Sequence, residues 1–135
     1  MSIKINLFLL FVYGTLKRGG ANHERFLKRL GAEFLGQIHS APGYQMHSRG
    51  WFPVVSEAEQ SEGTVFGELY GVSQGLLDLL DHYEGVNHEF PEKGLFARKR
   101  IKLQNDQREP FYYHYNGPVG GLEPIPDGSF SVRKK

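Results

Sequence analysis

The 135-residue chain contains no cysteine. This absence excludes disulfide cross-links, zinc sites built on thiolates and catalysis by a cysteine nucleophile. A disulfide-rich secreted scaffold is therefore excluded as a class. A cytoplasmic location is compatible with the composition and is our expectation.

A marked excess of charge of either sign is also absent. The chain carries 16 Lys and Arg against 15 Asp and Glu, which gives a net charge of +1. Such a balance does not predict a nucleic-acid or membrane surface, because both kinds of surface need an excess of positive charge. We therefore expect a small molecule as the partner, with no nucleic acid and no membrane. The sequence does not indicate an oligomeric state.

Long hydrophobic runs are absent as well. The apolar run near the N-terminus covers residues 7–12, whereas a membrane-spanning helix needs about 20 apolar residues. The run leads into Tyr13 and Gly14 without the small-residue cleavage pattern of a signal peptide. Continuous apolar character that ends near a glycine is instead typical of a central strand covered on both faces.

Common cofactor and metal motifs are missing. Neither a P-loop nor a G-x-G-x-x-G pattern occurs, and no two of the six histidines have H-x-x-x-H spacing. Nucleotide binding through those motifs and a helical metal site are therefore unsupported. We expect no cofactor and no metal.

Short strands and helices can be placed along much of the chain. Composition and alternation predict strands at residues 7–12, 34–38, 63–72, 95–103 and 110–115. The last two are separated by polar residues suited to a hairpin turn, so we expect them to pair antiparallel.

Two segments have the apolar spacing of short helices. Residues 21–31 predict an amphipathic helix with Asn22 as its N-cap. Residues 73–85 predict a second helix that Ser73 caps and a glycine ends. Glu84 then lies in the last turn of that helix.

The remaining segments carry weaker patterns. Residues 32–53 are rich in glycine and aromatic side chains, and no element boundary is clear beyond the strand at 34–38. The C-terminal stretch is dense in glycine and proline, which predicts a loop followed by a mobile basic tail at residues 130–135. Altogether we expect one domain over residues 1–135, with a mixed α+β fold, a curved, barrel-like sheet and two or so short helices.

The turn after the first strand is one candidate binding element. A glycine at a strand end lets successive backbone N–H groups face a pocket, where they form a concave site for a carboxylate or an oxyanion. The residues concerned are Tyr13, Gly14, Thr15 and Leu16. An ordinary tight turn has the same local sequence, so the pattern alone leaves both interpretations open.

Glu84 is the candidate acid or base. The helix macrodipole disfavours an anion at a helix C-terminus, so this position opposes the local preference. Burial and the nearby charges of Asp78 and Asp81 would raise the pKa of the Glu84 carboxyl toward neutrality, where proton transfer is efficient. The alternative is a solvated surface glutamate beside a glycine that ends the helix.

Several segments together carry a family resemblance. They are FVYGTLKRGGANHERFL, GTVFGELYGV, LLDLLDHYEGV, the F-x-R step at Phe96–Arg98 and IPDGSF. In this order, from about Phe11 to Phe130, the chain resembles the AIG2-like, γ-glutamylcyclotransferase-like family. Its opening block is most similar to the γ-glutamylamine cyclotransferase branch.

The resemblance implies a small mixed, barrel-like fold and an enzyme without a cofactor. It also implies a substrate pocket lined by Tyr13, Gly14, Thr15 and Leu16, with Glu84 as the catalytic residue. Such enzymes need no serine or cysteine nucleophile, because the free α-amine of a γ-glutamyl group attacks its own γ-carbonyl carbon. The products are 5-oxoproline and a released amine.

Three positions bear comparison with the family pattern. Phe96 stands where the family often has tyrosine, and Phe130 stands near a position where it often has tryptophan. The missing hydroxyl at Phe96 would remove a pocket hydrogen bond, so either the substrate differs or the position serves packing. Glu68 recurs in the pattern, and we expect it to orient a neighbour or to pair with Arg98.

Two other functions are compatible with the sequence. A noncatalytic module could bind a carboxylate or an amino acid through the same turn, with Glu84 merely exposed. A nucleic-acid accessory protein is the third hypothesis, and its affinity would fall steeply with salt. The sequence does not name the leaving amine.

Overall fold

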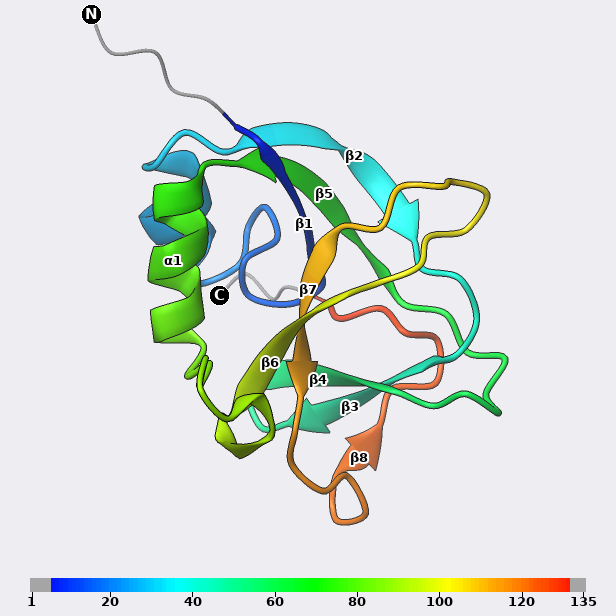
Figure 1. Ribbon diagram of the computed structural model, residues 1–135. Coiled ribbons are helices and arrows are strands. Elements are labelled where there is room, and N and C mark those ends of the chain that lie inside the picture. The colour runs from blue at the N-terminus through cyan, green and yellow to red at the C-terminus, as the bar shows by residue number, and fades with distance from the viewer. Residues whose placement is uncertain (1–5, 132–135) are drawn as a thin grey trace, which may run out of the picture.

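The computed structural model describes residues 6–131, and their strands form two β-sheets with one α-helix beside the larger sheet (Figure 1). The strands are β1 (Phe8–Val12), β2 (Glu33–His39), β3 (Tyr44–Arg49), β4 (Phe52–Glu57), β5 (Phe66–Val72), β6 (Phe96–Arg100), β7 (Phe111–Tyr115) and β8 (Glu123–Pro124). The helical segments are α1 (Gln74–Tyr83), a π-helical segment (His23–Lys28) and a 3₁₀ turn (Pro91–Lys93).

The larger sheet has the strand order β2-β5-β1-β7-β6, so β1 lies at its centre. β1 runs antiparallel to β5 and parallel to β7. Leu10, Phe11 and Val12 are at most 3% exposed, as expected for a strand covered on both faces. The predicted central strand is confirmed, and so is the antiparallel pairing of β6 with β7.

The smaller sheet has the order β4-β3-β8, and none of its three strands was predicted. The β3–β4 hairpin lies within and just beyond the glycine- and aromatic-rich residues 32–53. Met46 and Val55 from this hairpin are buried in one cluster with Phe11 and Tyr112 of the larger sheet. This packing between the two sheets stabilises the hairpin. The hairpin does not depend on a regular alternation of apolar and polar residues, and its sequence shows little of it.

The mixed α+β class is confirmed. The larger sheet is curved, as Figure 1 shows, but β2 and β6 remain at its two edges. Within residues 6–131 neither sheet closes on itself, so "barrel-like" describes curvature only.

Helix α1 forms as its sequence predicts. The Ser73 side chain accepts a hydrogen bond from the Leu76 N–H at 3.2 Å, which caps the N-terminus. Leu76, Leu77 and Leu80 are buried against the larger sheet's core cluster. No helix among the described residues has the length and apolar character needed to span a membrane.

The segment after the first turn differs from its prediction. The expected helix over residues 21–31 is a six-residue π-helix, His23–Lys28, and the Asn22 side chain does not cap it. The Asn22 amide instead donates to Thr15 Oγ1 at 2.9 Å, inside the turn that follows β1. Asn22 therefore stabilises the turn, and the helix loses its side-chain cap.

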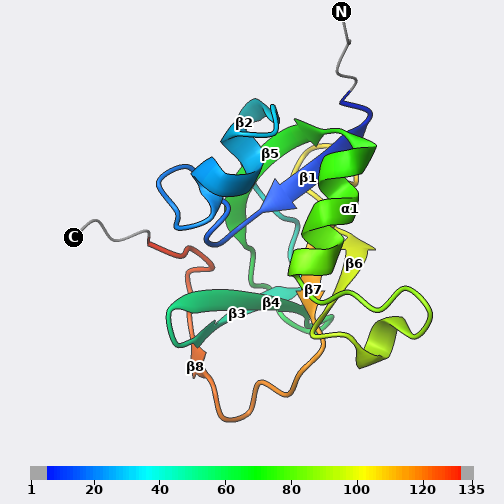
Figure 2. The same ribbon diagram turned by 90° about the vertical axis from the view of Figure 1, so that its left-hand side faces the viewer.

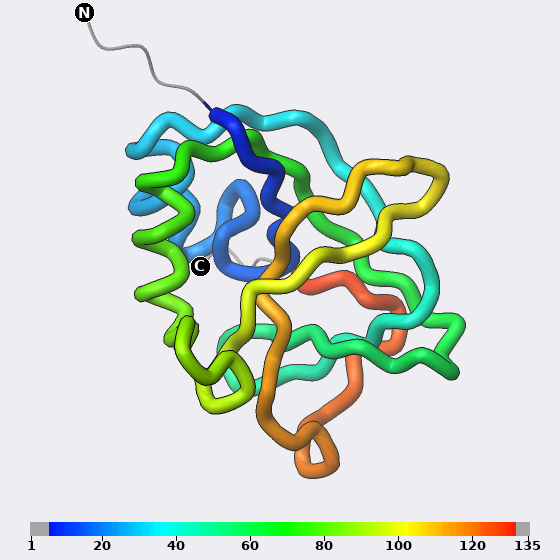
Figure 3. Tube along the Cα trace, in the orientation of Figure 1, coloured from blue at the N-terminus to red at the C-terminus, as the bar shows by residue number. Residues whose placement is uncertain are grey.

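The C-terminal stretch returns to the turn after β1, as the tube in Figure 3 traces. Phe130 packs against the inter-sheet cluster, and its carbonyl oxygen accepts a hydrogen bond from Lys17 Nζ at 2.7 Å. Burial lowers the pKa of this lysine. Residues 132–135 of the expected mobile tail lie outside the described residues.

Candidate active site

Glu84 and the turn residues Tyr13, Gly14, Thr15 and Leu16 line one pocket of about 160 Å³, which we call the inner pocket. Three elements that are far apart in the sequence surround it: the turn after β1, the C-terminal end of α1 and the β3–β4 hairpin. Figure 2 faces this side of the molecule and shows the three elements together.

Helix α1 carries Glu84 into the inner pocket. Glu84 is the C-cap residue, and its N–H donates to the Leu80 carbonyl at 2.8 Å. Gly85 follows with φ of 71°, a left-handed conformation that favours glycine and ends the helix at this point. Burial raises the pKa of the Glu84 carboxyl from its ordinary 4.5 to about 7.

The predicted influence of Asp78 and Asp81 on Glu84 is wrong, because burial alone accounts for the raised pKa. Asp78 is exposed and accepts a hydrogen bond from Gln74, one turn earlier. Asp81 is buried, and its carboxylate pairs with Arg98 instead of facing Glu84 unpaired. The desolvation of a single carboxyl group therefore produces the shift.

The turn after β1 packs closely against the hairpin. A Cβ atom on Gly14 would lie 2.9 Å from Pro53 Cγ, so only glycine fits without displacement of β4. The N–H groups of Gly14, Thr15 and Leu16 have no acceptor among residues 6–131. All three residues line the inner pocket, so their unused N–H groups are the candidate donors for a ligand oxygen there.

Asn22 and Glu68 hold the turn in shape. Asn22 binds Thr15 twice, through its amide to Oγ1 at 2.9 Å and through its N–H to the Thr15 carbonyl at 3.0 Å. Glu68 is 5% exposed and accepts hydrogen bonds from the Arg18 N–H and the Tyr70 hydroxyl, both at 2.9 Å. Glu68 thus orients a neighbouring segment as predicted, but it does not pair with Arg98.

Tyr13 connects the turn to β7. Its hydroxyl donates to the Tyr113 carbonyl at 2.7 Å. Burial, and secondarily the charge of Glu84, raises the pKa of the Tyr13 hydroxyl far above its ordinary value. Tyr13 therefore stays neutral over the whole physiological range.

A buried polar network around Asp81 was missed by the sequence reasoning. Asp81 is 1% exposed and accepts a hydrogen bond from the Tyr113 hydroxyl at 2.7 Å. Its other carboxylate oxygen lies 3.1 Å from Arg98 Nη1 and 3.3 Å from His88 Nε2. The network joins α1, β6 and β7 one helical turn before Glu84. The sequence showed only that Asp81 lies three residues, or about one helical turn, before Glu84.

The remaining walls of the inner pocket are apolar and come largely from the unpredicted hairpin. Trp51, Phe52 and Pro53 line it from that side. Phe96 lines it from β6, is 4% exposed and packs edge-on against Tyr115 with ring centroids 5.7 Å apart. The missing hydroxyl at Phe96 therefore leaves an apolar wall with a packing role.

Ser73 lies at the junction of β5 and α1. The residues from Gly71 to Gly75 have the spacing G-x-S-x-G, a pattern that marks the nucleophile of many hydrolases and that the sequence reasoning overlooked. Ser73 has an extended backbone, with φ of −78°, and its side chain caps α1. No histidine contacts Ser73 among the described residues, so its role is that of a helix cap.

Metal binding has no structural support in the part of the chain that the structure describes. No group of three or more His, Cys, Asp or Glu side chains there is arranged to hold an ion. The chemistry available to the inner pocket is thus a carboxyl group with a pKa near neutrality beside unused backbone donors.

A family model for AIG2-like γ-glutamyl cyclotransferases matches residues 10–132, which include the turn and Glu84. The chain belongs to this family. γ-Glutamylaminecyclotransferase A of Danio rerio is 34% identical over 113 residues, which are 77% of this chain and 66% of that protein. This chain thus spans slightly less than two thirds of the length of the zebrafish protein. The relative's name agrees with the branch that the opening block resembles.

Solved structures of similar fold support the same assignment. A crystal structure of an AIG2-like protein from Mus musculus has a TM-score of 0.73 at 25% identity, and the match covers 92% of this chain and 88% of that chain. The solution structure of ytfP from Escherichia coli has a TM-score of 0.63 at 30% identity, with 91% and 96% covered. The family member described here therefore has the fold of its relatives.

Proposed function

We propose that this protein cyclises γ-glutamyl compounds, releasing 5-oxoproline and an amine. One observation carries the proposal: a partly buried carboxyl group with a pKa of about 7 shares a small pocket with three unused backbone N–H groups. The first group suits proton transfer near neutral pH, and the second suits the stabilisation of an oxyanion. The family name points to the same reaction.

Ring closure needs few protein groups. Ionised Glu84 takes a proton from the substrate's α-ammonium group, and the freed amine attacks the γ-carbonyl carbon. The carbonyl oxygen becomes an oxyanion that accepts hydrogen bonds from N–H groups of the turn at Gly14, Thr15 and Leu16. Glu84 then gives its proton to the leaving nitrogen as the carbon–nitrogen bond breaks. The ring nitrogen gives up its second proton to the released amine, which leaves as an ammonium ion. Intramolecular attack in a held conformation supplies a large part of the rate, since effective molarities reach about 10⁵ M or more.

The size and polarity of the inner pocket fit this reaction. Its volume of about 160 Å³ is below the roughly 300–1,000 Å³ that enclose a drug-sized ligand. The inner pocket therefore suits one amino-acid-sized group, and the leaving amine must extend beyond it. Tyr13 and Tyr113 remain neutral because their pKa values are strongly raised, so they position the site without competing for the proton.

A panel of γ-glutamyl compounds tests the proposal. We expect at least one of them to yield 5-oxoproline, and we expect the Glu84→Gln variant to turn over about a hundredfold more slowly, as is typical when a general acid or base is removed. Glu89→Gln is the matched control, because Glu89 is exposed and lies outside the inner pocket. The wild-type kcat/KM should rise with pH through about 7, as Glu84 ionises.

Two results would contradict the proposal. If Glu84→Gln turned over a good substrate as fast as the wild type, Glu84 would not be the proton carrier. Saturable binding of γ-glutamyl compounds without any turnover would support the noncatalytic binding module instead.

A further inference from the structure

A second cavity adjoins the inner pocket. It has a volume of about 650 Å³ and shares Thr15 and Trp51 with the inner pocket. We call it the outer groove; its other walls come from the turn after β1, the tip of the β3–β4 hairpin and the C-terminal stretch. Figure 2 shows these three segments on the same side of the molecule.

The outer groove is neutral along its described walls. Small residues such as Gly20, Ala21 and Ser48 dominate its lining, and Trp51 and Phe130 supply the aromatic surface. No Asp, Glu, Lys or Arg belongs to the lining within residues 6–131. Trp51 is 65% exposed, which is unusual for so large an apolar side chain.

Three cations that adjoin the lining residues have partners among the described residues. Lys17 donates to the Phe130 carbonyl. The Arg18 guanidinium lies over the Phe34 ring, 3.9 Å from its centroid, and faces Glu68. The Arg49 guanidinium lies over the Tyr115 ring at 5.7 Å. The described lining itself therefore offers no ion partner to a carboxylate or an ammonium group of a ligand.

We propose that the outer groove binds the amine side of the γ-glutamyl substrate and selects amines whose body is apolar and uncharged. This inference rests on the proposed function, since it names the leaving group of the same reaction. Because the two cavities share Thr15 and Trp51, the groove lies beside the inner pocket, where the amine side of a bound substrate can extend. An aromatic or alkyl body gains contact with Trp51 there, whereas a charged group would lose hydration without an ionic partner.

Two ligands that differ in one carboxylate test the selection. They are γ-glutamyl-phenethylamide and γ-glutamyl-phenylalanine, with γ-glutamyl-methylamide as the reference that fills the inner pocket alone. We expect kcat/KM of the wild-type protein to be about tenfold higher for the phenethylamide than for the phenylalanine compound. Equal values, or a preference for the carboxylate, would overturn the proposal.

Trp51 provides a readout that does not require turnover. It is the only tryptophan in the chain and lines both cavities, so its fluorescence reports on ligands in either one, and γ-glutamyl-methylamide gives the contribution of the inner pocket. Titrated into Glu84→Gln, the phenethylamide should change the emission more than the methylamide does and should bind at least fivefold more tightly than γ-glutamyl-phenylalanine. The same emission change and affinity for all three ligands would overturn the proposal.

A charge placed in the groove should shift the preference. Ala21 is exposed and lies on the wall, so Ala21→Arg should raise the ratio of kcat/KM for γ-glutamyl-phenylalanine over the phenethylamide by fivefold or more. Gln107→Arg adds the same charge at an exposed site outside both cavities and should leave the ratio unchanged. An unchanged ratio in Ala21→Arg would contradict the proposal. The two proposals fail differently: absence of 5-oxoproline from every compound refutes the reaction, while the difference in emission and affinity between the phenethylamide and the methylamide tests the groove without turnover.

Discussion

Glu84 combines a useful pKa with a cost in stability. Its pKa is about 7 in the folded protein and 4.5 in the ordinary state, so folding favours the protonated form. For an acid whose pKa is raised on folding, stability is highest below pH 4.5 and falls as pH rises through 7. The full effect of such a shift is about 3 kcal/mol, at 1.36 kcal/mol for each pH unit.

Replacing this residue should therefore stabilise the protein at high pH. We expect Glu84→Gln to raise the free energy of unfolding by up to about 3 kcal/mol at pH 8, and to have little effect at pH 4. Urea unfolding at the two pH values measures the difference, with Glu89→Gln as the control. A gain of the same size at both pH values would show that ionisation of Glu84 is not the cause.

Gly14 sets the distance between the turn and the hairpin. In Gly14→Ala the new Cβ would lie 2.9 Å from Pro53 Cγ. We expect a loss of about 1–3 kcal/mol in the free energy of unfolding, as for other overpacked sites, and a clear fall in kcat. Gly75→Ala is the matched control, since a Cβ there meets nothing within 4 Å. Unfolding curves that place both variants at wild-type stability would refute the role of close packing at Gly14.

At the scale of elements, the Asp81 network fixes α1 relative to the larger sheet. Asp81 lies three residues before Glu84, and its partners Tyr113 and Arg98 lie on β7 and β6. Tyr13 on the turn also binds the Tyr113 backbone. One chain of contacts therefore links the helix that carries Glu84 to the turn that carries the backbone donors.

The pairing of Asp81 with Arg98 can be tested by breaking it and by removing it whole. Asp81→Leu alone leaves the Arg98 guanidinium, 21% exposed, without an anion. We expect it to destabilise the protein by about 3–5 kcal/mol. The double variant Asp81→Leu, Arg98→Met should recover most of this stability, but not kcat, because α1 stays detached from Tyr113. A double variant with full kcat would show that the network does not position Glu84.

Predictability differed between elements for a physical reason. Helix α1 and strand β1 have their apolar pattern and their cap within their own residues, and both were predicted. The β3–β4 hairpin is stabilised by contacts between sheets and β8 by pairing with β3, and these strands were missed. The segment His23–Lys28 was placed correctly but took a π-helical form, since Asn22 binds Thr15 instead of capping it.

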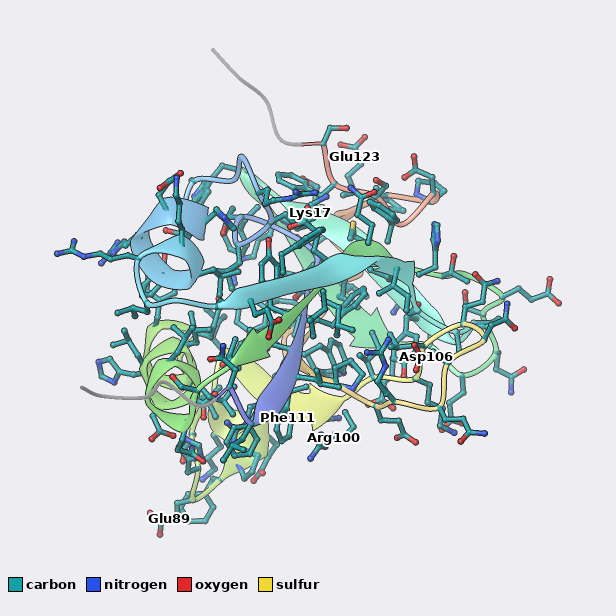
Figure 4. The ribbon with its side chains drawn as sticks, turned by 90° about the horizontal axis from the view of Figure 1, so that it is seen from above. Lys17, Glu89, Arg100, Asp106, Phe111 and Glu123 are labelled. Atoms are coloured by element: carbon teal, nitrogen blue, oxygen red, sulfur yellow. The ribbon has the colours of Figure 1, made fainter. Side chains whose placement is uncertain are left out.

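At the scale of the whole molecule, the 16 Lys and Arg residues nearly balance the 15 Asp and Glu residues. The basic run at 98–100 does not form a patch, because Arg98 faces Asp81 and Lys99 lies 3.2 Å from Glu57. The Arg100 guanidinium stacks on the Phe111 ring at 3.8 Å, and Figure 4 shows these two labelled side chains together. No cluster that would attract a polyanion is present in this part of the described surface.

This distribution predicts a weak dependence on salt. Between roughly 50 and 300 mM NaCl, we expect kcat/KM for a γ-glutamyl substrate to change by less than about threefold, because backbone dipoles rather than side-chain cations face the substrate. Steady-state kinetics across this range, at constant pH, measures the effect. A fall of roughly 10³-fold or more would instead indicate the counterion release of a nucleic-acid site.

The sequence by itself determined the local features: the buried strand, the glycine turn after it, and a helix that starts at Ser73 and ends beside Glu84. These depend on periodicity, capping and glycine, which act over a few residues. Only the tertiary structure decided that Glu84 and the turn line one pocket and that the hairpin at Trp51 encloses it. The tertiary structure also decided that Asp81 pairs with Arg98 and not with a neighbour on its own helix. Those outcomes depend on packing between segments tens of residues apart, where desolvation and close contact act, and a one-dimensional pattern does not contain them.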